Sequence, residues 1–148
     1  MLLLYMLSNS SKYALKAVLY LSLYSDDNNK LFVKDISENT DIPRAYTAKL
    51  LQELARRNLI SSTRGPKGGF YVSEENRQQC VMSIVDAIDG KSKMETCMLG
   101  LEDCDESKPC PLHHLIVSSR TALIQVLETK TIQDLATELE HKRAFMPK

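Results

Sequence analysis

The chain has 148 residues, of which 43% are hydrophobic and 26% charged. This is the composition of an ordinary globular domain, and it excludes collagen-like, mucin-like and disordered chains. A chain of this length buries roughly 68 to 70% of the surface that it exposes when unfolded, so its core needs no disulfides. The only strongly apolar run, Met1–Leu7, is far shorter than the roughly 18 residues of a membrane span, and no basic residue precedes it. We expect a cytoplasmic protein without a membrane segment.

The net charge of zero hides an uneven distribution. Residues 1–72 hold ten Lys or Arg and six Asp or Glu, whereas residues 73–148 hold nine and thirteen. The two halves therefore carry charges of +4 and −4. The molecule is electrically polarised.

The first half of the chain predicts three helices. Apolar residues spaced for one helical face predict a helix over Ser11–Tyr24. A second, short helix fits Val33–Thr40. A third should begin near Pro43, whose fixed φ suits a first helical turn, and end near Asn58, which tolerates the left-handed conformation. The apolar positions of the first helix are Ala14, Ala17, Val18 and Leu21.

A hairpin and a further helix follow. Leu59–Thr63 and Phe70–Val72 favour strands, and residues 64–69 between them hold three of the five glycines. This pattern predicts a hairpin with a basic tip. Val81–Ile88 repeats the helical spacing, and Gly90 is placed to end that helix.

The last third predicts a loop, a long helix and a short one. Residues 91–110 show no apolar period and contain three of the four cysteines. Pro111–Glu128 predicts a long helix whose wide apolar arc needs two neighbours. Thr131 and Asp134 form a capping-box pattern before a last helix at Ile132–Leu139. The arc of the long helix consists of two stripes, Leu112, Leu115, Ala122 and Val126, then Ile116, Leu123 and Leu127.

Two short helices followed by a strand, a glycine-rich tip and a strand form the layout of a winged helix-turn-helix. Six basic residues and one acid between Pro43 and Val72 give this segment a charge of +5. Such a patch suits duplex DNA, because neutralised phosphates release condensed counterions. The alternative is a solvated helix face beside an ordinary hairpin. The basic residues are Arg44, Lys49, Arg56, Arg57, Arg64 and Lys67.

Several motifs of this region occur together in one known family. They are Lys12–Ala17, Asp35–Glu38, Ile42-Pro43 with Tyr46, Leu50–Leu54, and Arg64-Gly65-Pro66 with Gly68-Gly69-Phe70. Through them, residues 6–73 resemble the Rrf-type winged-helix transcriptional regulators, the group that contains the IscR and NsrR branches. The resemblance implies a mainly α fold with a small β-hairpin: a winged helix-turn-helix at 6–73, a linker helix and cysteine-rich loop at 74–110, and a dimerisation helix with a C-terminal helix at 111–142.

The resemblance also implies how DNA is bound. A homodimer would hold a partly palindromic double-stranded operator, with the third helix in the major groove and Arg64 of the wing in the minor groove. Ala48 and Lys49 stand where the IscR branch has acidic and amide side chains, so the family does not define the operator sequence. The expected DNA contacts are Arg44, Ala45, Thr47, Ala48, Lys49, Arg64 and Lys67.

Three cysteines and a histidine form a second constellation, C-x6-C-x5-C-x2-H, at Cys97, Cys104, Cys110 and His113. If Pro111 opens the long helix, the last two of these ligands lie at its start, facing the loop. Thiolates suit an iron–sulfur cluster or zinc. Structural zinc sites usually contain a cysteine pair two to four residues apart, which this loop lacks. A metal-free thiol switch remains open. A disulfide would leave one of the three cysteines over and is rare in a reducing cytosol.

The resemblance favours a cluster, [2Fe-2S] or [4Fe-4S]. It implies Cys97, Cys104 and Cys110 as ligands, with His113 as the fourth, as in the IscR branch. NsrR-like members instead use an acidic residue of the partner's first helix, where this chain has Lys12.

The resulting hypothesis is a bacterial transcriptional regulator that senses redox state, nitric oxide or iron–sulfur status. The alternatives are a thiol-switch regulator of the same fold, or a small zinc or electron-transfer protein. We expect no enzymatic activity. A cysteine–histidine hydrolase needs a nucleophile held by a base and an oriented third group, whereas Cys110 and His113 lie in a loop crowded with other thiols.

Overall fold

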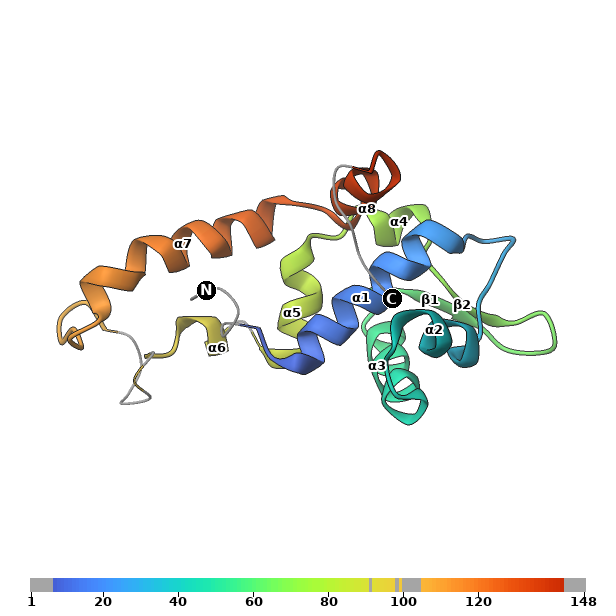
Figure 1. Ribbon diagram of the computed structural model, residues 1–148, viewed down its shortest axis with the longest axis horizontal. Coiled ribbons are helices and arrows are strands. Elements are labelled where there is room, and N and C mark those ends of the chain that lie inside the picture. Colours follow the sequence, from blue (N-terminus) through green and yellow to red (C-terminus); the bar gives the residue numbers. More distant parts are fainter. Residues whose placement is uncertain (1–6, 91, 98, 100–104, 143–148) are drawn as a thin grey trace.

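The computed structural model describes residues 7–90, 92–97, 99 and 105–142. The molecule is elongated: α2, α3 and the two strands lie at one end, α7 extends toward the other, and α1 and α5 lie between them (Figure 1). The elements in chain order are α1 (Asn9–Tyr24), α2 (Val33–Thr40), α3 (Arg44–Arg56), β1 (Ser61–Thr63), β2 (Gly69–Tyr71), α4 (Glu74–Arg77), α5 (Val81–Asp89), α6 (Ser92–Glu95), α7 (His113–Thr129) and α8 (Ile132–Glu140).

Helix α1 is the centre of the core. Its four predicted apolar positions are completely buried, and the helix packs against α2, α3, α5 and α8. It begins at Asn9, two residues earlier than predicted, because the Ser8 Oγ accepts a hydrogen bond of 3.0 Å from the Ser11 backbone N–H and caps the first turn. The burial of its four apolar positions confirms the predicted periodicity.

The helix-turn-helix and the wing follow the sequence pattern closely. Helix α2 has the predicted bounds, and Asn58 just after α3 takes a φ of 59°, the left-handed conformation expected of it. The two strands pair antiparallel, with Ser62 opposite Phe70. The first strand is shorter than predicted, because Leu59 and Ile60 are buried in the core before the pairing begins. The second has the predicted length but begins one residue earlier, at Gly69.

The strand β2 also contacts the segment that precedes α2. Backbone hydrogen bonds join Leu31 and Phe70 in both directions, at 2.9 and 2.8 Å. Strand β2 of the wing is thereby hydrogen-bonded to the segment that leads into α2.

After the wing, helix α4 is an element that the periodicity did not predict. It has four residues and a capping box in which Ser73 and Asn76 bond reciprocally. Helix α5 confirms the prediction for 81–88, and Gly90 closes it with a φ of 80°.

The region around the cysteines differs from the prediction in two ways. A short helix, α6, lies in the segment predicted as a loop. The long helix begins at His113 and not at Pro111, because Cys110 to Leu112 form a turn in which the Cys110 carbonyl accepts from the His113 N–H at 3.0 Å. Cys110 is therefore one turn before α7 and is not its cap.

Helix α8 returns to the core, and its predicted capping box at Thr131 and Asp134 is confirmed. Ile132 and Ala136 are fully buried on its inner face. Among the helices that the structure describes, none combines the length and the apolar composition needed to cross a bilayer.

Candidate nucleic-acid interface and sensor loop

The outer face of α3 begins with exposed residues. Arg44, Ala45 and Lys49 are exposed, and Ala48 is half-buried. Thr47 differs from the other predicted contacts: it is completely buried and its Oγ1 donates to the carbonyls of Ile42 and Pro43, at 3.2 and 3.1 Å. Its hydroxyl is used inside the protein to hold the turn, so we leave it out of the DNA contacts proposed below.

The C-terminal end of α3 carries an ion-pair network. Arg56 donates to both carboxylate oxygens of Glu53, at 3.0 and 2.7 Å, and Arg57 donates to one of them at 2.7 Å. These hydrogen bonds, first from Arg56 and then from Arg57, lower the pKa of Glu53 to about 2. Two of the six basic side chains counted in the sequence are thus engaged by the one acid.

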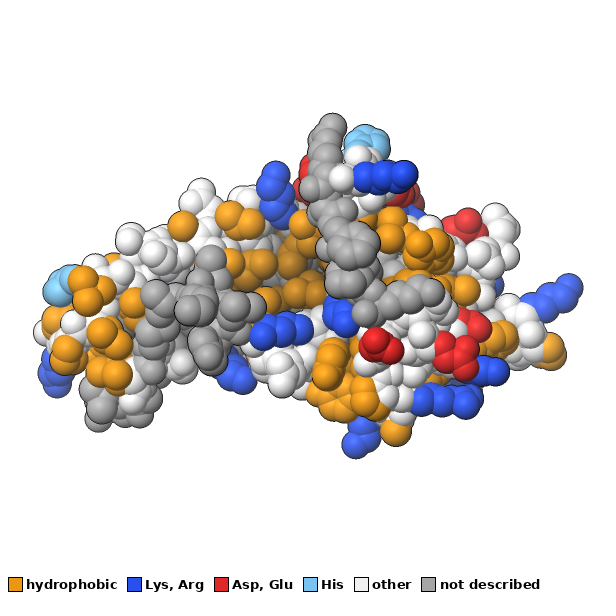
Figure 2. Space-filling model, viewed as in Figure 1, with side chains coloured by type: hydrophobic (Ala, Val, Ile, Leu, Met, Phe, Trp, Pro, Cys, Tyr) orange, Lys and Arg blue, Asp and Glu red, His pale blue; other side chains and the backbone are white. Residues whose placement is uncertain are grey.

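The tip of the wing is shaped by glycine. A Cβ on Gly68 would lie 2.3 Å from the Thr63 carbonyl oxygen, closer than any side chain permits. The tight turn leaves Arg64 and Lys67 exposed. Figure 2 shows Lys and Arg side chains projecting around the end of the molecule that holds α3 and the wing. Basic groups on a helix and on an adjacent wing can contact a DNA groove and the phosphates that flank it.

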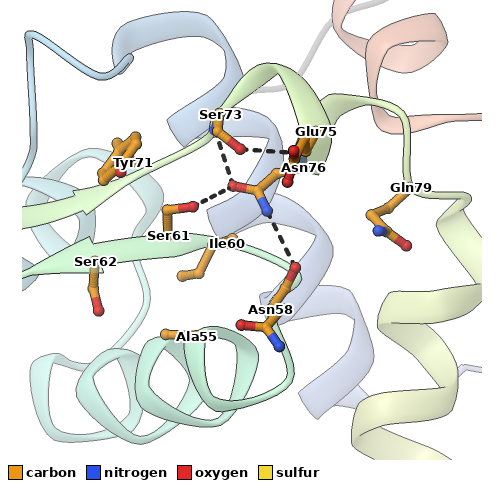
Figure 3. Close-up of a pocket in the computed structure, with 10 residues that line it drawn as sticks. All are labelled: Ala55, Asn58, Ile60, Ser61, Ser62, Tyr71, Ser73, Glu75, Asn76 and Gln79. Carbon is orange, nitrogen blue, oxygen red and sulfur yellow. Dashed lines mark hydrogen bonds between the residues drawn. The ribbon is translucent and has the colours of Figure 1, made fainter.

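Behind the wing lies a pocket of about 540 Å³ between α3, β1 and α4 (Figure 3). Its wall is held by Asn76, which is only 5% exposed. The Asn76 Oδ1 accepts from the Ser61 Oγ at 2.8 Å and the Ser73 N–H at 2.9 Å, and its Nδ2 donates to the Asn58 carbonyl at 3.1 Å. One amide thus joins the end of α3, the first wing strand and the start of α4.

The first turn of α1 connects the end of α5 with α3. Asp89, at the end of α5, accepts from the Ser8 N–H at 3.1 Å and the Ser11 Oγ at 2.7 Å, and the Ser8 hydroxyl also bonds to it. The hydroxyls of Ser10 and Tyr46 are hydrogen-bonded, which ties the same turn to α3. The apolar pattern alone gave no sign of these polar links.

Of the four predicted metal ligands, the structure describes three. Cys97 and His113 are 8% and 4% exposed, and Cys110 is half-buried. Cys104 lies outside the described residues. Among the described residues, no three His, Cys, Asp or Glu side chains come close enough together to hold a metal ion. The prediction of a complete four-ligand site therefore stays a prediction.

The chemistry and burial of the donors fit a soft metal centre. Cys97 and His113 are sheltered from water, although the described residues between them are mostly exposed. Thiolate with imidazole is a donor set of iron–sulfur clusters. Asp105 lies near His113: hydrogen bonds from the Ser107 side chain and backbone lower the pKa of Asp105, and attraction from His113 adds to this. The neighbouring His114 is exposed.

Helix α7 has one covered face and one open face. Ile116 and Leu127 are buried, and the helix packs against α5. Leu115 and Val126, on the other predicted stripe, are 73% and 51% exposed. Figure 2 shows hydrophobic side chains gathered at the end of the molecule where α7 begins.

Comparison with known sequences identifies a family. Residues 7–138 match the model of the Rrf2 family, whose description is iron-dependent transcriptional regulator. A protein of Aquifex aeolicus that bears the provisional name HTH-type transcriptional regulator is 32% identical over 140 residues, covering 93% of this chain and 95% of that protein. The regulator IscR of Vibrio parahaemolyticus is 28% identical over 134 residues, covering 90% of this chain and 79% of IscR.

Solved structures share the fold. CymR, the global cysteine regulator of B. subtilis, superposes with a TM-score of 0.71 at 21% identity, covering 88% of this chain and 95% of CymR. IscR of T. potens gives a TM-score of 0.68 at 19% identity, covering 94% and 91%. These likenesses confirm the predicted winged-helix fold.

Proposed function

The chain belongs to the Rrf2 family of transcriptional regulators, and from this membership we propose that it binds an operator as a homodimer under the control of a cysteine-ligated iron–sulfur cluster. The observation that carries the proposal is the burial of Cys97 and His113 on the two sides of the cysteine loop, next to the helix that leads back to the DNA-binding end. The similarity to IscR supports the choice of cofactor.

DNA contact follows from the exposed cations. The first turns of α3 present Arg44, Ala45, Ala48 and Lys49 to the major groove, while Arg64 and Lys67 on the wing reach the neighbouring minor groove and phosphates. A helix N-terminus beside a phosphate adds its own favourable field. Arg64 is the residue that reads a narrow, A·T-rich minor groove in this proposal.

The open face of α7 supports dimerisation. Helix α5 packs against α7 but leaves Leu115 and Val126 exposed. A second α7, packed against the first, would remove this surface from water, and burying one Leu side chain contributes about 1.5 to 3 kcal/mol. A dimer also spaces two α3 helices for the two halves of a palindrome.

Cluster binding would be linked to DNA binding through packed elements. When bound, a cluster supplies a redox-active centre that oxidants and nitric oxide attack. Cys97 follows α6, whereas Cys110 and His113 precede and open α7, so holding one centre fixes α6 relative to α7. Helix α7 packs on α5, and α5 packs on α1 and α3, which places the loop and the recognition helix in one connected unit.

The direct test is the spectrum and composition of protein purified without oxygen. We expect visible absorption, with iron and sulfide bound in equal amounts. Cys97→Ala, Cys104→Ala and Cys110→Ala should each abolish the absorption, and His113→Ala should leave a labile cluster. Cys80→Ala is the matched control, because Cys80 lies outside the loop with its Sγ 3.2 Å from the Ser83 Oγ.

Two results would contradict the cluster. Colourless protein after anaerobic reconstitution, with one zinc per chain, would show that the loop binds zinc and not a cluster. Colourless, metal-free protein whose DNA affinity changes with thiol oxidation would identify a thiol switch of the same fold.

A further inference from the structure

Helix α7 carries a buried cation. Arg120 is only 8% exposed, and its Nη1 makes one long hydrogen bond, 3.4 Å, to the Glu95 carbonyl in α6. A guanidinium has five N–H donors. Among the residues that the structure describes, no carboxylate forms an ion pair with it.

A buried charge of this kind requires a counter-charge. Removing an ion from water costs several kcal/mol, which one carbonyl contact does not offset. Arginine never loses its proton in a protein, so neutralisation is closed to it. The position therefore calls for an anion close to the guanidinium.

The location of Arg120 narrows the choice of anion. Seven residues separate Arg120 from His113, which is about two helical turns, so both side chains leave α7 on one face. Ile116, between them, is buried on that face. The carbonyl that Arg120 contacts belongs to Glu95, two residues before Cys97. Arg120 thus lies between the two ends of the cysteine loop.

We propose that Arg120 is a positioning residue of the sensor, supplying the positive charge that balances the anionic, thiolate-ligated centre held by Cys97, Cys104, Cys110 and His113. The inference rests on the proposed function. Three thiolates give the centre a net negative charge, and each electron taken up from an added reductant makes it more negative. A guanidinium fixed beside such a centre favours its reduced state and stabilises the ligands that hold it.

The test compares Arg120→Gln with Arg120→Lys, which keeps the charge, in the anaerobically reconstituted dimer. Arg120→Gln should shift the reduction potential to a more negative value in a dithionite titration. It should also speed cluster loss to a chelator by about 10- to 100-fold, the usual range for groups that support metal ligands. Arg120→Lys should restore most of both properties. Lys130→Gln removes one charge from the far end of α7 and should change neither.

Unfolding of the cluster-free protein supplies a second readout. Without the anionic centre, Arg120 is a buried charge with no counter-charge among the residues that the structure describes, so Arg120→Gln should leave the urea midpoint unchanged or raise it. A lowered midpoint in the cluster-free variant would show that a carboxylate of the protein is the partner, which overturns the inference.

The remaining outcomes separate the two claims. A coloured Arg120→Gln protein with the wild-type potential and the wild-type rate of cluster loss overturns the role of Arg120 and leaves the proposed function standing. A wild-type protein that never acquires a cluster overturns both.

Discussion

Asn76 offers the sharpest test of how the wing is held. The side chain is buried and makes three hydrogen bonds, to Ser61, Ser73 and Asn58. Asn76→Ala removes all three, and each intramolecular hydrogen bond contributes about 0.5 to 1.5 kcal/mol net. We therefore expect the free energy of unfolding to fall by about 2 to 4 kcal/mol. For a domain of this size the corresponding decrease in Tm is roughly 5 to 15 °C.

The assay is urea unfolding followed by circular dichroism, with DNA affinity measured in parallel. Gln79→Ala is the matched control, because Gln79 lines the same pocket but is exposed. Its stability should stay within about 0.5 kcal/mol of wild type. Asn76→Asp keeps the shape but places a carboxylate against the Asn58 carbonyl, so it should also be destabilised. A loss below about 0.5 kcal/mol in Asn76→Ala would refute the reasoning, since it would mean that the three bonds do not hold the wing.

Three further predictions concern charge, assembly and pH. Glu53→Gln frees Arg56 and Arg57 and removes a negative charge from α3, so DNA affinity should rise and the slope of log affinity against log salt should steepen by about one to two units; an unchanged slope would show that these arginines do not reach phosphates. Leu115→Asp puts a charge on the open face of α7 and should give monomers in sedimentation experiments, whereas an unchanged dimer would place the interface elsewhere. Burial raises the pKa of Asp89, but its hydrogen bonds outweigh this and lower the pKa below the ordinary value. The stability that the ionised carboxylate contributes is therefore present above about pH 4 and is lost as the pH falls through the folded pKa. In Asp89→Asn, the urea midpoint should depend less on pH in this range.

Local patterns were enough to predict most elements. The apolar spacing of α1, the left-handed Asn58, the closing Gly90 and the capping box at Thr131 each act within a few residues, so the sequence alone reveals them. The short α4 shows no period in four residues, although Ser73 and Asn76 stand at capping-box spacing. That spacing was the one available signal.

The sites were harder to foresee, because burial depends on residues distant in the sequence. Thr47 sits among exposed residues of α3 but faces the core, which only the helix packing determines. An arginine in a helix is usually interpreted as a solvated side chain. Arg120 is buried and contacts the Glu95 carbonyl of α6, which the sequence of α7 does not reveal. Pro111 fits a first helical turn, yet the Cys110 carbonyl bonds to His113 and moves the start of α7 to that residue.

The most direct test is the affinity of one operator fragment for the cluster-bound and cluster-free forms of the same preparation. The fragment would be selected from random DNA by the reconstituted protein, and binding followed by fluorescence anisotropy at fixed salt. Because coupling between two sites typically amounts to about 1 to 3 kcal/mol, we expect the two forms to differ by about 5- to 150-fold in affinity. Equal affinities of the two forms, once iron analysis has shown the cluster in the bound form and sedimentation has shown both to be dimers, would contradict control of DNA binding by the sensor loop.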